Sequence, residues 1–325
     1  MSDAFAERLP PEMFLSELAP MTDDPSAFDQ PVHAAQAAAF ATPALPPAPT
    51  AADGMLQLHA AVARLPMQRI GPFELRLQAG QRVAILGPSG AGKSTLLRLM
   101  AGERAPHEGR VLLDGRDLYR GPQAWSAVAL AQRRAVLPQS HSVAFGMPTP
   151  LVAALGRVAR EPDPDQARIV SAAMRLAQAS QLVGRRFDSL SGGEQARVQL
   201  ARVFAQLWDQ QQGLVLVDEP LAALDPGLQF ELMDALQQFT RERGHALVAV
   251  LHDINQALAG FDRLWLLRQG QLVADLRSDH TAVPKLEALY GIRLRCLTHA
   301  DGSLAVLPSR TPPHPSTPLQ CSERS

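Results

Sequence analysis

The chain has 325 residues, of which 46% are hydrophobic and 19% are charged, so it supports a sizeable core and excludes global disorder. A formal net charge of −1 gives no electrostatic reason to expect a nucleic acid as partner. Two cysteines favour a reducing compartment over a disulfide framework, and because no apolar run approaches the ~20 residues of a membrane-spanning helix, we expect no direct membrane insertion.

The first 54 residues differ from the rest of the chain. They hold eight acidic residues, one basic residue and nine of the 27 prolines. An acidic, Pro/Ala-rich segment without sustained periodicity predicts disorder, with a short helix near residues 12–18. Residues 309–325 form a second Pro-rich tail of the same kind. The folded unit is therefore expected over residues 55–308.

Within this unit, short apolar runs alternate with helical patterns, which predicts an α/β domain with a mainly parallel sheet. Continuous apolar runs are typical of strands that are buried on both faces. Pro150 suits the first turn of a helix, and Gln269-Gly270 indicates a hairpin turn. The predicted elements, in chain order, are a strand at 82–86, helices at 93–100, 149–158 and 166–179, and strands at 214–217, 246–251, 264–267 and 271–274.

A phosphate-binding loop joins the first of these strands to the first helix. Its sequence, Gly87-Pro-Ser-Gly-Ala-Gly-Lys-Ser94, fits G-x-x-x-x-G-K-[ST]. Glycines let successive N–H groups point at phosphate oxygens, and the following helix adds its positive end. We expect Lys93 to reach the β- and γ-phosphates, and Lys93 is one of only two lysines in the chain. The predicted nucleotide-binding residues are Gly87, Pro88, Ser89, Gly90, Ala91, Gly92, Lys93, Ser94 and Thr95.

Two adjacent carboxylates, Asp218 and Glu219, end the apolar run at 214–217. Alone, such a pair would more often be a solvated turn, but after a phosphate-binding loop it predicts a Mg²⁺ ligand followed by a residue that polarises the attacking water. Three single polar residues, Gln139, Asp225 and His252, occur near predicted strand ends. Each means little by itself, and their order along the chain is what makes them candidates.

A second motif, Ser191-Gly-Gly-Glu-Gln195, lies 98 residues after Lys93 and opens a helical pattern. The two motifs together resemble the ATP-binding subunits of ABC transporters over residues 55–308. The resemblance implies an ABC-type P-loop nucleotide-binding domain, in which a RecA-like core carries an antiparallel β subdomain and a helical subdomain at about residues 141–205.

The resemblance also implies that two copies hydrolyse ATP head to tail. The implied catalytic residues are Glu219, His252 and Gln139, and the implied Mg²⁺ ligands are Ser94, Gln139 and Asp218. The residues implied to contact the partner copy's ATP are Ser191, Gly192, Gly193, Glu194, Gln195 and Asp225.

Further motifs narrow the resemblance to importers of iron complexes: the runs at 133–139, 190–202 and 249–255 look like those of haem, ferric-siderophore and cobalamin importers, and the run at 290–308 looks most like haem importers. These imply two permease subunits, an extracytoplasmic binding protein and a peripheral place on the cytoplasmic face of the inner membrane. Siderophore or cobalamin import remains an alternative. A soluble ABC ATPase acting on DNA or ribosomes is the other class, disfavoured because 98 residues leave no room for a long coiled-coil insertion and the chain has one cassette.

Two departures from the family stand out. The family places an aromatic residue about two dozen positions before the phosphate-binding loop, whereas residues 63–70 contain no aromatic ring. Either Arg64 stacks on adenine through its guanidinium, or adenine is held loosely. The family also lacks a 54-residue acidic leader, and Met55 stands where its members commonly begin, so Met55 is an alternative start of translation.

Overall fold

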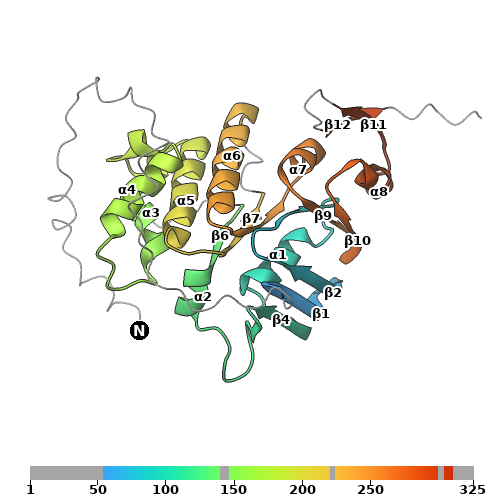
Figure 1. Ribbon diagram of the computed structural model, residues 1–325, viewed down its shortest axis with the longest axis horizontal. Helices are drawn as coiled ribbons and strands as arrows, with labels where there is room; N and C mark the ends of the chain where they lie inside the picture. The colour runs from blue at the N-terminus through green and yellow to red at the C-terminus, as the bar shows by residue number, and fades with distance from the viewer. Residues whose placement is uncertain (1–53, 140–145, 220–223, 299–303, 310–325) are drawn as a thin grey trace, which may run out of the picture. The chain divides into compact units, whose positions relative to one another are not determined.

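A six-stranded sheet forms the centre of the protein, which a computed structural model describes at residues 54–139, 146–219, 224–298 and 304–309 (Figure 1). Five strands are parallel, and the last, β10, pairs antiparallel with β9. The strand order is β10 (Gln271–Arg277), β9 (Arg263–Arg268), β3 (Arg82–Leu86), β8 (Ala246–Val250), β7 (Leu214–Asp218) and β6 (Arg134–Leu137). The predicted parallel sheet and the predicted hairpin around Gln269 are confirmed.

Both faces of this sheet are buried. In β7, Leu214 and Leu216 belong to one apolar cluster, whereas Val215 and Val217 belong to the other, and all four are fully buried. Side chains of a strand alternate between the two faces, so a continuous apolar run covers both of them. This explains why β7 and β8 lack a polar alternation in the sequence.

A second, antiparallel sheet covers the cluster that contains Leu214 and Leu216. Its strands are, in order, β2 (Gln68–Leu77), β1 (Leu56–Leu65), β4 (Glu108–Leu113) and β5 (Arg116–Asp117). Helix α1 (Lys93–Ala101) lies between the two sheets and contributes to the same cluster. The last two residues of the phosphate-binding loop, Lys93 and Ser94, thus begin a helix that both sheets bury.

The opposite cluster is built from helices. Helix α5 (Gly192–Leu207) packs against α3 (Thr149–Ala154) and α4 (Gln166–Leu176), and α2 (Ala127–Arg133) precedes β6. Helix 166–179 was predicted too long, because Gln178 adopts φ +51° and the helix ends at Leu176. The predicted helix at 149–158 is α3 followed by a short 3-10 helix, η2 (Leu155–Arg157).

The C-terminal part returns to the central sheet. Helices α6 (Pro226–Glu242) and α7 (Ile254–Gly260) flank β8, and α8 (Val283–Tyr290) leads into a two-stranded sheet of β11 (Arg293–Thr298) and β12 (Leu304–Ser309) (Figure 1). Short 3-10 helices η3 (Ser180–Leu182), η4 (Phe187–Ser189) and η5 (His280–Ala282) complete the described elements.

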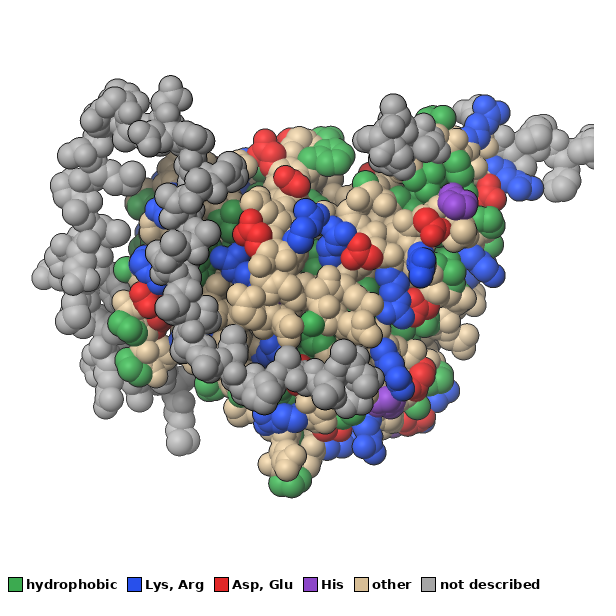
Figure 2. Space-filling view, in the orientation of Figure 1, with side chains coloured by type: hydrophobic (Ala, Val, Ile, Leu, Met, Phe, Trp, Pro, Cys, Tyr) green, Lys and Arg blue, Asp and Glu red, His purple; other side chains and the backbone are tan. Residues whose placement is uncertain are grey.

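The surface of the described residues carries mixed charge. On the face drawn in Figure 2, arginine and lysine side chains are interspersed with aspartate and glutamate side chains. Within the described ranges, no helix combines the length and the apolar character needed to cross a membrane. The predicted leader, its short helix near 12–18, and nearly all of the 309–325 tail fall outside the described residues.

Candidate functional site

The phosphate-binding loop lies between β3 and α1, as the sequence predicts. Gly87 begins it close to the backbone of β9: a Cβ atom on Gly87 would lie 2.2 Å from the Leu267 carbonyl oxygen. Farther along, the Ala91 N–H bonds to the Pro88 oxygen, and the Ala91 oxygen accepts from the Gly270 N–H. The curl of the loop is therefore held both by its own backbone and by the β9–β10 turn.

Lys93 is the charged centre of this loop. Its side chain is only 6% exposed, and its ammonium donates to the Gly87 oxygen at 2.9 Å and to the Pro88 oxygen at 3.3 Å. The same ammonium lies 3.8 Å from Glu219 Oε1. A buried cation is costly unless it is paired and hydrogen-bonded, and these contacts meet that need while keeping the charge beside the loop.

Asp218 and Ser94 form an oxygen-rich corner next to Lys93. The Ser94 hydroxyl donates to Asp218 Oδ1 at 3.0 Å, although the two residues are 124 positions apart. Burial raises the pKa of Asp218, which is 7% exposed, and the Ser94 hydrogen bond opposes that rise. Hydroxyl and carboxylate oxygens are ligands that Mg²⁺ prefers, usually together with water and substrate phosphates. The donor set at Ser94 and Asp218 fits such an ion.

Glu219 connects three neighbouring strands of the central sheet. It follows β7, Gln139 follows β6 and His252 follows β8. The Gln139 amide donates to Glu219 Oε2 at 3.2 Å, and His252 Nε2 lies 2.6 Å from the same oxygen. Glu219 has φ +46°, a left-handed backbone that non-glycine residues seldom adopt and that is common at functional sites. Because carboxyl ends of parallel strands share one edge, ligands bind at this position in open α/β sheets.

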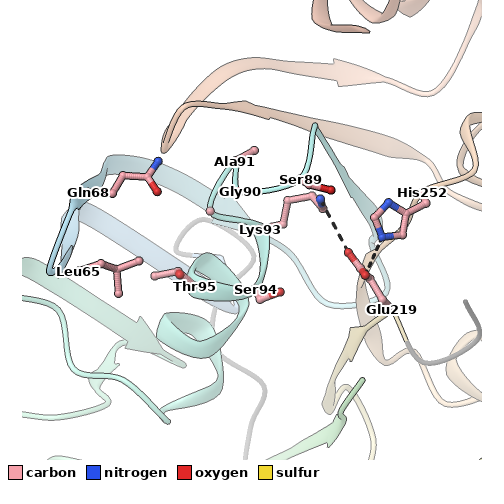
Figure 3. Close-up of a pocket in the computed structure, with 11 residues that line it drawn as sticks. Leu65, Gln68, Ser89, Gly90, Ala91, Lys93, Ser94, Thr95, Glu219 and His252 are labelled. Carbon is pink, nitrogen blue, oxygen red and sulfur yellow. Dashed lines mark ion pairs between the residues drawn. The ribbon is translucent and has the colours of Figure 1, made fainter. Parts of the chain in front are cut away.

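A cavity of about 330 Å³ runs along the phosphate-binding loop. In Figure 3, Lys93, Glu219 and His252 lie at one end of it, and Leu65 and Gln68 lie at the other. The residues that line it are Leu65, Gln68, Ser89, Gly90, Ala91, Gly92, Lys93, Ser94, Thr95, Glu219 and His252. Among the predicted nucleotide-binding residues, Gly87 and Pro88 are absent from this lining and instead hold the Lys93 ammonium.

Arg64 lies near the end of the cavity that lacks an aromatic ring, but its side chain is bound elsewhere. Its guanidinium donates to Glu108 Oε1 at 2.8 Å, and Arg69 donates to the other oxygen of the same carboxylate at 2.9 Å. Arg64 is not among the lining residues, whereas Leu65 and Gln68 are. Sequence reasoning missed these two, although their positions next to the turn of the β1–β2 hairpin were the available signal.

The second motif lies apart from this cavity. Ser191 caps α5: its hydroxyl accepts from the Glu194 N–H, and Glu194 accepts from the Ser191 N–H. Arg185 pairs with Glu194 at 2.5 Å, and the Ser191 N–H bond is the main reason why the pKa of Glu194 lies below its ordinary value. Among the described residues that line the cavity, none comes from positions 191–195.

The remaining motif residues pack around this helix start. A Cβ atom on Gly193 would lie 2.6 Å from the Leu228 side chain, so a larger residue there would have to displace that side chain of α6. The Gln195 amide donates to the Phe187 and Leu190 oxygens, both at 3.3 Å. Asp225 caps α6 by accepting from the Leu228 N–H at 3.0 Å. Gly192 has no neighbouring atom within 4 Å of a would-be Cβ, so the tip of α5 is open.

Comparison with known proteins identifies relatives of this chain. The family described as "ABC transporter" matches residues 70–222. The hemin import ATP-binding protein HmuV of Pseudomonas aeruginosa is 44% identical over 235 residues, which cover 70% of this chain and 89% of that protein. The protein of the same name from Rhodococcus jostii is 39% identical and covers 82% of this chain and 90% of its own length.

Solved structures share the fold. An inward-facing putative metal-chelate type ABC transporter matches with a TM-score of 0.65 at 22% identity, covering 79% of this chain and 97% of that one. The dimeric, ADP- and phosphate-bound cassette MJ0796 matches with a TM-score of 0.59 at 23% identity, covering 69% and 99%. At these identities the likeness concerns the fold alone.

Proposed function

The chain belongs to the ABC transporter family as an ATP-hydrolysing subunit of an importer, and we propose that its transporter carries haem across the inner membrane. Relatives between 38% and 45% identical that bear the name hemin import ATP-binding protein support the cargo. The geometry supports the chemistry through one observation: Glu219 meets Gln139 and His252 at its Oε2 atom, while its Oε1 atom lies 3.8 Å from the Lys93 ammonium.

Glu219 is proposed to orient the attacking water. It is the carboxylate that lines the cavity among the described residues, and it lies beside the lysine that would hold the transferred phosphate. Gln139 and His252 fix its carboxylate from the two neighbouring strand ends, so that less motion is needed before reaction. His252 is half exposed, which leaves its ring accessible to the γ-phosphate.

Phosphate binding is assigned to residues 87–95. Backbone N–H groups of the loop and the Lys93 ammonium would neutralise the phosphates, and Leu65 and Gln68 would lie beside the base. Ser94, Asp218 through water, and Gln139 would hold Mg²⁺, which supplies charge neutralisation on the phosphates when bound. The Ser94–Asp218 hydrogen bond places the first two of these groups together.

A second copy of the chain is proposed to complete each site. Ser191, Gly192, Gly193, Glu194, Gln195 and Asp225 do not line the cavity of their own chain. The tip of α5 presents backbone N–H groups and the positive end of a 16-residue helix, which suits a phosphate brought by another subunit. The MJ0796 cassette, which shares the fold, is a dimer in its ADP- and phosphate-bound structure, in accord with this arrangement.

Mixed variants test the shared site. Ser191→Arg disrupts the residues that a chain contributes to the ATP site of its partner. Lys93→Ala disrupts the phosphate-binding loop of the chain's own ATP site. Each variant alone should lose phosphate release, whereas an equimolar mixture should regain a fraction of it, because one heterodimer site then has both halves intact. If the mixture releases no phosphate although gel filtration shows that dimers form, the head-to-tail proposal is contradicted.

The permease partners and the cargo need a cellular test. We propose that Gln139, with the segment that follows it to about residue 160, contacts two permease subunits served by an extracytoplasmic binding protein; residues 140–145 of that segment lie outside the described part. A deletion of the gene should abolish growth on haem as sole iron source and spare growth on inorganic iron. In the reconstituted transporter, ATP turnover should rise with the haem-loaded binding protein. If only a siderophore- or cobalamin-loaded binding protein stimulates turnover, the haem assignment is wrong, whereas the importer assignment still holds.

A further inference from the structure

Asn255 is the only asparagine among the 325 residues, and it lies three positions after His252. Glutamine and aspartate occur throughout the chain, so neither amide nor acid chemistry is rare in it. The contacts of Asn255 show what a short planar amide does at this position.

The Asn255 side chain pairs with both polar backbone groups of one residue on β12. Its Oδ1 accepts from the Val306 N–H at 2.7 Å, and its Nδ2 donates to the Val306 oxygen at 3.1 Å. Val306 is 2% exposed, so these backbone groups depend on protein partners. An aspartate would lack the donor, and a glutamine would be one methylene too long. The amide thus acts as a one-residue strand that attaches β12 to α7.

Asn255 lies in the first turn of α7, three positions after His252. The Asp253 carboxylate caps α7 by accepting from the Asn255 N–H at 2.7 Å and the Gln256 N–H at 3.3 Å. His252 immediately precedes this cap, and its side chain is 50% exposed, so few neighbours fix the ring. Its 2.6 Å approach to Glu219 therefore depends on where the start of α7 holds the backbone.

The same C-terminal segment also touches the phosphate-binding loop. Burial raises the pKa of the hydroxyl of Tyr290, the last residue of α8, and the nearby backbone N–H of Gly87 opposes that rise. Helix α8 is anchored by the buried Leu286 and Leu289, and Glu287 accepts from the Leu294 N–H at the start of β11. Figure 1 shows α8, β11 and β12 beside α7 and β9.

We propose that α8, β11 and β12 form a C-terminal brace for the catalytic site, and that Asn255 is a positioning residue that transmits this brace to His252. The inference rests on the proposed role of His252 in hydrolysis. Among the described residues, no hydrogen bond joins Asn255 to the phosphate-binding loop or to Glu219; Asn255 acts by fixing the first turn of α7 against β12.

Asn255→Ala should lower kcat roughly 10- to 100-fold, the range that a mispositioned catalytic group produces. The KM for ATP should stay within about twofold, because the loop contacts of Lys93 are untouched. Asn255→Asp, which keeps only the acceptor, should also lose kcat. Val306→Pro removes the N–H that donates to Asn255 Oδ1, so it should reproduce the loss of kcat although Val306 is 51 positions away. The control Val306→Ala keeps both backbone groups and should not lower kcat.

The double variant Asn255→Ala/Val306→Pro decides between positioning and general destabilisation. If both act through one contact, the double variant should turn over no more slowly than the slower single variant. Multiplicative losses, or a kcat within twofold of the parent in Asn255→Ala, would overturn the proposal. His252→Ala is measured in parallel: if it keeps normal turnover, the role assigned to His252 fails, and if it is inactive while Asn255→Ala is normal, only the brace fails.

Discussion

Replacing Glu219 by glutamine separates ATP binding from hydrolysis. The substitution keeps the shape of the side chain and removes its charge. Glutamine still accepts one hydrogen bond, but its amide faces the donors of Gln139 and His252, which lie 3.2 and 2.6 Å from the present oxygen. No group among the described cavity-lining residues offers another carboxylate to orient water.

The size of the effect follows from this geometry. A positioned general base contributes about 10²- to 10⁴-fold to a rate, which corresponds to roughly 3–5 kcal/mol of barrier at about 1.36 kcal/mol per tenfold change. ATP affinity should hold or improve, because Lys93 loses the carboxylate at 3.8 Å and keeps its charge for the phosphates. Slow hydrolysis with retained binding should therefore trap a dimer around two nucleotides.

Phosphate release, nucleotide binding and gel filtration with ATP measure these three outcomes. Glu242→Gln is the matched control, since it makes the same chemical change on the exposed end of α6, beside Arg243. The control should hydrolyse ATP like the parent. Near-normal turnover in Glu219→Gln would refute the assigned role, and loss of ATP binding would refute the expectation that ATP binds without the Glu219 charge.

Three further outcomes are expected. GTP should be hydrolysed nearly as well as ATP, because Leu65 and Gln68 supply no ring and base stacking is worth about 1–3 kcal/mol; a strong ATP preference in steady-state kinetics would show another means of base selection. Deleting residues 1–54 should leave the melting temperature and the ATPase activity nearly unchanged, since an acidic Pro-rich segment adds little to a core; mass spectrometry of the native N-terminus tests the start at Met55. Burial, with the charge of Arg243, lowers the pKa of His245 to about 3, so the unfolded chain binds a proton below pH 6.5 that the folded chain rejects. Unfolding free energy should thus fall by up to about 1.4 kcal/mol per pH unit on acidification below about 6.5, and denaturant titrations of His245→Gln should give a shallower slope.

The central sheet could be predicted because each of its strands has a sequence pattern that is recognisable without its neighbours. Runs such as 214–217 are wholly apolar, and burial on both faces is the physical reason. The phosphate-binding loop and the positions of Glu219 and His252 at strand ends follow from the same pattern, since parallel strands deliver their carboxyl ends to one edge. Helix ends were less predictable: Gln178 carries no sequence sign that its backbone becomes left-handed.

Contacts between distant segments could not be predicted in this way. The sequence allowed Arg64 to stack on adenine, but in the structure its guanidinium pairs with Glu108 on β4. That pairing depends on which strand lies beside β1. Likewise, the Asn255–Val306 pair joins residues 51 positions apart, on helix α7 and on strand β12, and no local periodicity marks that strand. Both cases turn on tertiary neighbours rather than on the residue's own preference.

The rarity of a residue type in the chain is a partial guide to such contacts when the tertiary neighbours are unknown. The chain uses arginine almost everywhere a cation is needed, so Lys93 stands out, and it proves buried with its ammonium between Gly87 and Glu219. Asn255 stands out for the same reason and proves to satisfy two backbone groups. Lys285 is equally rare but exposed on α8, so rarity alone does not identify a required side chain. Rarity becomes informative when the structure adds a contact that the chain's commoner residues have the wrong length or the wrong donors to make.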